Sequence, residues 1–228
     1  MAKRNDSTPD PRPPLSRDRV LQAAIALADD GGLELLTMRR LGQELGVEAM
    51  SLYNHVADKE DILDGIIDLV LNEVDLSPPG SDWAEAMRKC AISVHEALLR
   101  HPWACGLILS PTTARLVPGR IRYLESVLRR LREADFSAEA AYHGYHALDS
   151  HILGFTLWEL GHSMPGDDAA EVVASILRDF PFDDYPYIAE HADQHRTMSN
   201  LDDEGEFEFG LDLILDGLER MRGSGSRE

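Results

Sequence analysis

The amino-acid sequence predicts an all-α protein, with a small three-helix domain followed by a larger helical domain. Apolar residues recur at three- and four-residue intervals along most of the chain, which is the spacing of one helix face. No segment alternates apolar and polar residues for long enough to make a strand. Residues that begin or end helices separate the apolar-periodic segments. Together these three observations favour helices throughout.

The first two predicted helices each have a polar cap and a glycine end. Ser16 can cap the first helix, which ends at Asp30-Gly31-Gly32. Thr37 can cap the second, over residues 38–45, and Gly46 can end it. The residues expected to face the core are Val20, Ala24, Leu27, Met38, Leu41 and Leu45.

Two further helices complete the N-terminal part. A short third helix is expected from about Glu48 to His55, and Asp58 can cap a fourth. The fourth carries a wide apolar stripe, and the Pro- and Gly-containing residues 75–82 end it. The stripe consists of Ile62, Leu63, Ile66, Ile67 and Val70.

Longer helices are expected after this break. Residues 110–119 are predicted to be a loop, and the very acidic residues 179–206 to be irregular. The predicted helices span residues 82–100, 119–134, 138–163 (begun by Ser137), 168–179 and 205–221.

The composition excludes several classes of protein. The formal net charge is −19, but residues 1–60 hold nearly equal numbers of acidic and basic residues. Remote charges are screened beyond about 8 Å, so this end can still face a polyanion. No apolar run reaches about 18 residues, and the start lacks the apolar core of a secretory signal, so no membrane contact is expected. The basic residues of the N-terminal tail are Lys3, Arg4, Arg12, Arg17 and Arg19.

The chain contains two cysteines, Cys90 and Cys105, which is too few for a disulfide framework. Free thiols in a reducing cytoplasm are the expected state, and a redox sensor is the alternative.

Residues 37–63, "TMRRLGQELGVEAMSLYNHVADKEDIL", contain a helix that ends in glycine, a short turn and a second short helix. This order is typical of a helix-turn-helix, whose second helix enters the DNA major groove. A plain helical hairpin inside a bundle has the same order and is the alternative.

The surrounding sequence, residues 16–70, resembles the N-terminal domain of the tetracycline-repressor (TetR) family. The matching elements are "LTMRRLGQELGV" and, after a short turn, "SLYNHVADKEDILDGI". The family's recurring Leu-Tyr-x-His-Val and the lysine that opens the fourth helix stand here at residues 52–56 and at Lys59. The resemblance implies an N-terminal three-helix DNA-binding domain with a helix-turn-helix.

The short third helix is expected to present one side to DNA. Leu52 and Val56 can anchor it to the core. Ser51 and Tyr53 can then donate to phosphates, and Lys59 with the start of the fourth helix can bind another phosphate.

Two further residues can read bases. Arg39 matches a family position that often contacts a base and could fork onto guanine, and Asn54 could pair with adenine. The short helix has no Lys or Arg, so affinity must also come from the basic tail and from two linked half-sites. The residues expected at DNA are Thr37, Arg39, Ala49, Met50, Ser51, Tyr53, Asn54, His55 and Lys59.

By resemblance, the rest of the chain is a larger helical domain that binds a small-molecule effector and dimerises. The segment "YLESVLRRLREADFSAEAAYHGYHALDSHILGF" is similar to two long helices of the tetracycline repressor. That repressor has a metal-coordinating His in the loop that reads "SPTTARL" here, and this loop has none. Glu159 falls near the family's second carboxylate. We therefore expect no metal, no cofactor and an effector other than tetracycline–magnesium.

An effector pocket is expected between the fourth and eighth helices. His143, His146 and Asp149 recur every three residues, a spacing that can hold zinc. Hydrogen bonding in the pocket or to a dimer partner is the favoured reading of these residues. Candidate lining residues, which mix aromatic surface with a few polar groups, are Trp83, Met87, His95, Trp103, His143 and Phe155.

The dimer is expected to form through a four-helix bundle. The 138–163 helix and the last helix, with Leu211 and Leu215 on its seam, would pair with their copies. Packing within one chain is the alternative.

The function these observations favour is a cytoplasmic, ligand-responsive transcriptional regulator: a homodimeric repressor that an effector releases from a palindromic operator. The alternative is a helical enzyme or metal-binding protein that uses the His-rich helix 139–162. No Gly-x-Ser-x-Gly, phosphate loop or HExxH supports an enzyme, and no catalytic residue is expected. The expected division is a tail 1–15, a DNA-binding domain 16–62, an effector-binding and dimerisation domain 63–222, and a tail 223–228.

Overall fold

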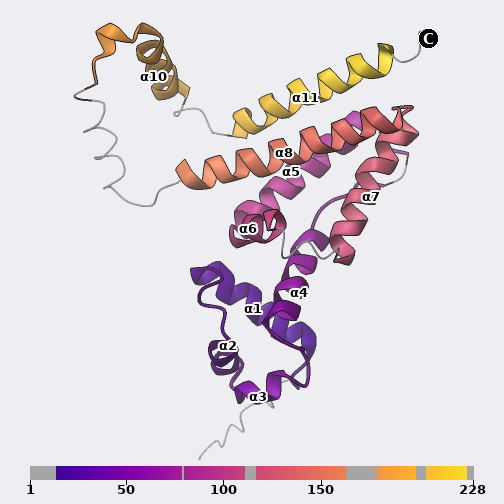
Figure 1. The fold of residues 1–228 in the computed structure, drawn as a ribbon, viewed down its shortest axis with the longest axis vertical. Coiled ribbons are helices and arrows are strands. Elements are labelled where there is room, and N and C mark those ends of the chain that lie inside the picture. The colour runs from indigo at the N-terminus through magenta and orange to yellow at the C-terminus, as the bar shows by residue number, and fades with distance from the viewer. Residues whose placement is uncertain are drawn as a thin grey trace, which may run out of the picture. The chain divides into compact units, whose positions relative to one another are not determined.

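The computed structural model describes residues 14–78, 80–110, 117–162, 178, 180–198 and 204–224. These residues form α-helices and one short 3-10 helix, with no strand among them, so the all-α prediction is confirmed (Figure 1). They belong to two compact units, one ending at Ile66 and the other beginning at Ile67. The predicted division after residue 62 stays a prediction. No helix in the described ranges has the length and apolar character needed to cross a membrane.

The first unit contains α1 (Arg17–Gly31), α2 (Met38–Leu45), α3 (Ala49–Leu52) and the start of α4 (Lys59–Asn72). The predicted caps are confirmed: Ser16 accepts from the N–H of Arg19 at 3.3 Å, and Asp58 accepts from the N–H of Asp61 at 2.8 Å. The helices enclose an apolar core of Val20, Leu21, Ala24, Ile25, Leu36, Leu41, Leu52, Val56, Ile62 and Ile66.

The second unit begins with the end of α4 and is built around one long helix. Helix α8 (Ala138–His162) packs against α5 (Trp83–Arg100), α7 (Pro118–Glu133) and α11 (Glu204–Ser224). Figure 1 shows α8 and α11 running side by side. The remaining elements are α6 (Trp103–Leu109), the 3-10 helix η1 (Phe182–Asp184) and α10 (Pro186–Met198).

Three elements differ from the prediction. Helix α3 is shorter than residues 48–55, because the N–H groups of Asn54 and His55 bond three residues back, to Ser51 and Leu52, in a tight turn. The sequence does not predict helix α6, since Arg100-His101-Pro102 indicates the end of a helix, whereas Pro102 here occupies the N-cap position of α6 without a side-chain capping bond.

The third difference is α10, which lies in the segment expected to be irregular. Pro186 is its first residue, a position where the missing N–H costs nothing. The predicted helix at 168–179 falls outside the described residues apart from residue 178, as do residues 111–116 of the predicted loop.

The prediction that Leu211 and Leu215 of α11 face a dimer partner is wrong. Leu211 and Leu215 are 0% and 5% exposed within the single chain, because this face of α11 packs into its own unit. The exposed large apolar side chains of α8 and α11 are instead Tyr142, Leu157, Trp158, Phe209, Leu213 and Met221.

Candidate nucleic-acid interface

Two glycines hold the turn between α2 and α3. Gly46 ends α2 at φ 69° and ψ 35°, in the left-handed region, and its N–H donates to the carbonyl of Gln43 at 3.1 Å. Gly42 lets the two helices approach closely. A Cβ at Gly42 would lie 2.9 Å from the oxygen of Val47 and 3.2 Å from the nitrogen of Ala49. The angle between α2 and α3 therefore depends on both glycines.

Helix α3 is anchored on one side and open on the other. Leu52 and Val56 are 0% and 3% exposed, which confirms them as anchors. Met50 and Tyr53 are 74% and 46% exposed, and Asn54 is exposed as well. Methionine is among the residues most often buried, and tyrosine is intermediate. Their exposure on one short segment leaves them available to a binding partner.

The other predicted contact residues lie on the same unit. Ala49, Ser51 and His55 are half-buried on α3 and the turn after it, and Arg39 is exposed on α2. They flank the exposed side chains of α3 in the sequence.

Thr37 and Lys59 also keep donors available. Thr37 Oγ1 accepts from the N–H of Arg40 at 3.2 Å, so its oxygen caps α2 while its hydroxyl hydrogen is still able to donate. Lys59 is exposed, and its Nζ lies 3.5 Å from the carbonyl oxygen of Leu33. An ammonium has three N–H groups, so this long contact leaves capacity for a phosphate.

An ion pair that the sequence analysis missed fixes the start of α4. Arg17 donates from Nη1 and Nη2 to the two carboxylate oxygens of Asp61, at 2.8 Å and 2.7 Å. Asp61 also accepts from the N–H of Ala57 at 2.8 Å, and Arg17 reaches the carbonyl of His55 at 3.4 Å. The hydrogen bond to Asp61 raises the pKa of Arg17.

The sequence suggested that Arg17 belongs to a free basic tail, but the ion pair with Asp61 shows that it does not. It is the first residue of α1, and its charge is committed to holding the chain that follows α3. Arg19, another residue assigned to the tail, also lies on α1, and Lys3, Arg4 and Arg12 lie outside the described residues.

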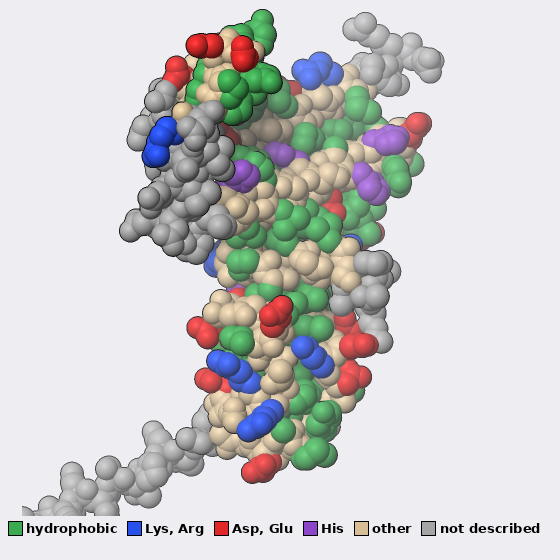
Figure 2. Space-filling model, turned by 60° about the vertical axis from the view of Figure 1, so that its left-hand side comes forward, with side chains coloured by type: hydrophobic (Ala, Val, Ile, Leu, Met, Phe, Trp, Pro, Cys, Tyr) green, Lys and Arg blue, Asp and Glu red, His purple; other side chains and the backbone are tan. Residues whose placement is uncertain are grey.

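The first unit has no continuous basic patch on the face drawn in Figure 2, where Lys and Arg side chains are separated by Asp and Glu. Between residues 37 and 60 the exposed cations are Arg39, Arg40 and Lys59, and the exposed acids are Glu44, Glu48, Asp58 and Glu60. Long-range attraction to a polyanion is therefore weak at this surface.

The second unit places the predicted effector-pocket residues in different surroundings. Trp83 is buried on α5, with its ring edge-on to Phe136 at 5.0 Å and its Nε1 donating to Glu219 at 3.1 Å. Met87, on the same helix, is also buried. His143 is exposed on α8.

The remaining predicted residues lie on α5, α6 and α8. Trp103 is buried on α6, with its ring 5.9 Å from that of His101. Of the six candidates, His95 and Phe155 are in ring contact, with centroids 5.9 Å apart. Their role in ligand binding stays a prediction.

His95 belongs to a polar and aromatic cluster between α5, α8 and α11. Its Nδ1 lies 2.8 Å from Thr156 Oγ1, and its Nε2 lies 3.1 Å from Glu159 Oε2. Its ring stacks on Phe207 at 4.1 Å, and His151 stacks on Phe207 at 4.9 Å. Burial, with a smaller contribution from His151, lowers the pKa of His95.

The carboxylate and histidines in the middle of α8 have partners of their own. Asp149 accepts from the hydroxyls of Tyr123 and Tyr145 at 3.4 Å and 3.3 Å, and burial raises the pKa of Asp149. His146 Nδ1 lies 2.8 Å from the carbonyl oxygen of Tyr142. Within the described ranges, no group of three or more His, Cys, Asp or Glu is arranged to hold a metal ion.

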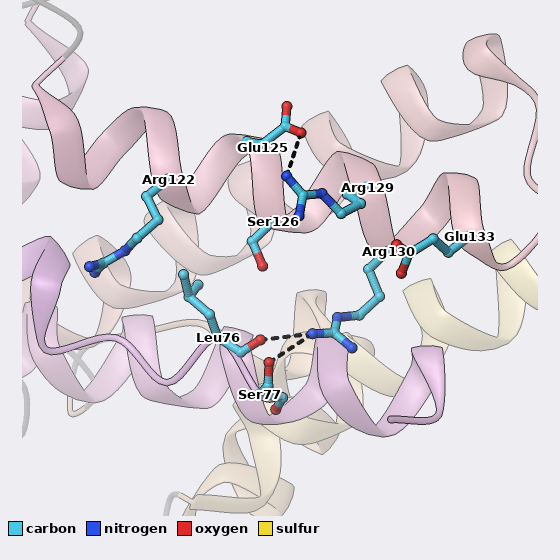
Figure 3. Close-up of a pocket in the computed structure, with 8 residues that line it drawn as sticks. All are labelled: Leu76, Ser77, Arg122, Glu125, Ser126, Arg129, Arg130 and Glu133. Carbon is cyan, nitrogen blue, oxygen red and sulfur yellow. Dashed lines mark hydrogen bonds and ion pairs between the residues drawn. The ribbon is translucent and has the colours of Figure 1, made fainter. Parts of the chain in front are cut away.

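A groove does occur on the second unit, between α7 and residues 76–77, as Figure 3 shows. None of the six predicted pocket residues lines it.

Comparison with known proteins assigns both units to one family. Residues 20–66 match the model described as bacterial regulatory proteins, tetR family, and residues 77–222 match the tetracyclin repressor-like C-terminal domain. The HTH-type transcriptional repressor DrrR1 of Streptomyces coeruleorubidus is 32% identical over 221 residues, covering 92% of this chain and 79% of that protein. The class D tetracycline repressor protein of Escherichia coli is 29% identical over 210 residues, covering 90% and 89%.

A solved structure agrees with these matches. ActR from Streptomyces coelicolor in complex with actinorhodin has a TM-score of 0.74 and 28% identity, covering 95% of this chain and 100% of that one. Both family models describe regulators, so the helical-enzyme alternative is set aside. The chain belongs to the TetR family of bacterial regulatory proteins.

Proposed function

We propose that this protein is a cytoplasmic transcriptional repressor that binds a palindromic operator as a homodimer and leaves it when a small molecule binds the second unit. The observation that carries the proposal is the helix-turn-helix of the first unit, with Met50 and Tyr53 exposed beside the buried anchors Leu52 and Val56. The repressor DrrR1, similar over most of both chains, supports the direction of regulation.

In this proposal the residues of the first unit divide into two groups. Thr37, Ser51, Tyr53 and Lys59 contact phosphates, which position the domain but carry no sequence information. The residues that face base edges are Arg39, Ala49, Met50, Asn54 and His55. Arg39 reads guanine through its planar fork, and Met50 packs against a thymine methyl group.

Two half-sites are needed because one head carries little net positive charge. The exposed apolar side chains of α8 and α11 supply the surface through which two copies pair. Figure 2 shows histidine and hydrophobic side chains next to each other on this unit. Pairing places two heads on grooves about 34 Å apart and multiplies their weak affinities.

The effector acts through α4, which begins in the first unit and ends in the second. The relative ActR, solved with actinorhodin, supports a small organic effector with aromatic character. Such a ligand shifts the equilibrium only by its preference for one conformation, with typical coupling of about 1–3 kcal/mol.

Selection of binders from random duplex DNA tests the proposal, and an enriched inverted repeat is expected. Lys59→Ala and Tyr53→Phe should weaken binding to all selected sequences, and Lys59→Ala should lower the salt dependence by about two ions, one for each half-site. Lys89→Ala, an exposed lysine on α5 of the second unit, is the matched control and should bind as wild type does. Enrichment of no inverted repeat would refute the repressor function.

The proposed release by an effector is tested by a thermal-shift screen of aromatic and cationic compounds. Compounds that raise the unfolding temperature are then added to the protein–operator complex. A tight ligand of the second unit that leaves operator affinity unchanged contradicts the proposed release.

A further inference from the structure

The groove between α7 and residues 76–77 has a volume of about 250 Å³, below the roughly 300–1,000 Å³ of sites for drug-sized ligands. A molecule of a few heavy atoms fits a space of this size. In Figure 3 Arg122 stands at one end and Glu133 at the other, with Ser126 pointing towards Leu76 between them. The lining residues are Leu76, Ser77, Arg122, Glu125, Ser126, Arg129, Arg130 and Glu133.

Arg130 forms the inner wall of this groove and is a buried cation. Arg130 is only 8% exposed. The guanidinium donates to the carbonyls of Leu76 and Ser77 at 2.9 Å each, and to that of Pro78 at 3.4 Å. These partners are neutral, and no carboxylate of the described residues forms an ion pair with Arg130. A buried charge without a counter-charge is costly, so an anion nearby would be stabilising.

Two polar atoms in the wall of this groove have no hydrogen-bond partner among the residues that the structure describes. Arg130 Nε and Ser77 Oγ are both buried and unpaired. Unpaired buried polar groups are rare in native proteins, so these two atoms mark a polar wall that the described residues do not fully satisfy. Ser77 also has φ 51°, an unusual backbone angle for serine; its carbonyl accepts from Arg130 and its N–H donates to Asp75 Oδ1 at 2.8 Å.

The mouth of the groove adds more donors. Arg122, Ser126 and Arg129 stand at positions i, i+4 and i+7 of α7, on one stripe of the helix. Arg129 is paired with Glu125 at 2.9 Å on the surface, where such pairs exchange readily with solvent. Within the described residues, Arg122 makes one long hydrogen bond, 3.3 Å, to the carbonyl of Leu71. Each guanidinium retains N–H groups that can bind an incoming oxyanion.

We propose that this groove is a binding site for a small oxyanion, either inorganic phosphate or the carboxylate or phosphate group of a small metabolite. The anion accepts hydrogen bonds from Arg122, Ser126 and Arg129, and its charge compensates that of Arg130 behind them. The site is separate from the effector-pocket candidates and does not depend on the proposed repressor function.

Calorimetric titration of the full-length protein without DNA tests the site, with inorganic phosphate and succinate as two probes at constant ionic strength. Saturable binding of either probe is expected, and which of them binds distinguishes a phosphate from a carboxylate ligand. The double variant Arg122→Gln/Arg129→Gln should bind at least about ten-fold more weakly, since it removes two charge-assisted donors. Lys89→Gln, which removes a similarly exposed cation of an i,i+4 pair, should bind as wild type does.

A local measurement keeps the result specific to the groove. Hydrogen–deuterium exchange should slow in residues 73–82 and in α7 when the probe binds. Protection confined to the first unit, binding unaffected by the double variant, or no saturable binding of either probe would each overturn the site. The unfolding temperature in chloride, unchanged in the variant, verifies that it folds.

Discussion

Replacing Gly42 with alanine should damage operator binding more than folding. The added Cβ would lie 2.9 Å from the oxygen of Val47, and 3.2 Å and 3.3 Å from the nitrogen and Cα of Ala49. All three are backbone atoms, so no side-chain rotation relieves the contact. The turn must open instead, which tilts α3 and moves Met50 and Tyr53 relative to α2.

The two effects have different magnitudes. Alanine is favoured over glycine inside a helix by about 1 kcal/mol, while overpacking costs about 1–3 kcal/mol, so the free energy of unfolding should fall by about 0–2 kcal/mol. At the operator, loss of roughly one hydrogen bond, about 1–1.5 kcal/mol, in each of two half-sites gives about 2–3 kcal/mol. That corresponds to a loss of affinity of about 30- to 150-fold.

Fluorescence anisotropy with the selected operator measures the affinity, and urea unfolding measures stability. Gly106→Ala is the matched control, because this exposed glycine of α6 lies outside the proposed pairing surface and an added Cβ would meet nothing within 4 Å. It should leave affinity unchanged and stability equal or higher. If Gly42→Ala binds operator within three-fold of wild type, the close approach at Gly42 does not position α3.

Three other predictions concern the second unit. Leu213 is 58% exposed in the single chain, so Leu213→Asp should give folded monomers by light scattering. Leu211 is 0% exposed, so Leu211→Asp should unfold the chain. A dimeric Leu213→Asp protein would contradict this pairing face. The lowered pKa of His95 means the unfolded chain takes up its proton first, so stability should fall as pH drops from about 6.5 through the folded pKa. Urea unfolding at two pH values should show a smaller loss of stability in His95→Gln than in the wild-type protein. An equal loss in both proteins would refute this role of His95. Burial raises the pKa of Cys90 to about 12, so a thiol reagent at pH 8 should label it only after unfolding; labelling of native Cys90 within minutes would be inconsistent.

Short-range signals account for what the sequence predicts well. Ser16, Thr37 and Gly46 act on backbone groups within four residues, so their roles can be recognised without knowing the fold. A local signal was also overlooked: residues 179–206 were expected to be irregular because they are very acidic, yet Pro186 stands at the first position of a helix there, α10.

Long-range contacts account for what the sequence does not predict. Arg17 and Asp61 are 44 residues apart, and nothing near either residue indicates their pairing. Trp83 is a plausible ligand contact by type, but its indole donates to Glu219, 136 residues later. Leu211 and Leu213 are indistinguishable by composition, and only the packing of α11 decides which is buried.

Helix α4 also bears on how such regulators can be recombined. Its first half is fastened within the first unit, where Asp61 bonds to Arg17 and where Gly65 packs so closely on Leu21 that an added Cβ would lie 2.6 Å from its Cδ2. Its second half is fastened within the second unit, where Asp68 accepts from the N–H of Gly119 at 2.5 Å. In a chimera joined between residues 66 and 67, each of these contacts is therefore formed by residues of the same parent protein. A junction after residue 62 would set a foreign side chain against Leu21, so crossovers in a library of hybrid sensors belong at the later point.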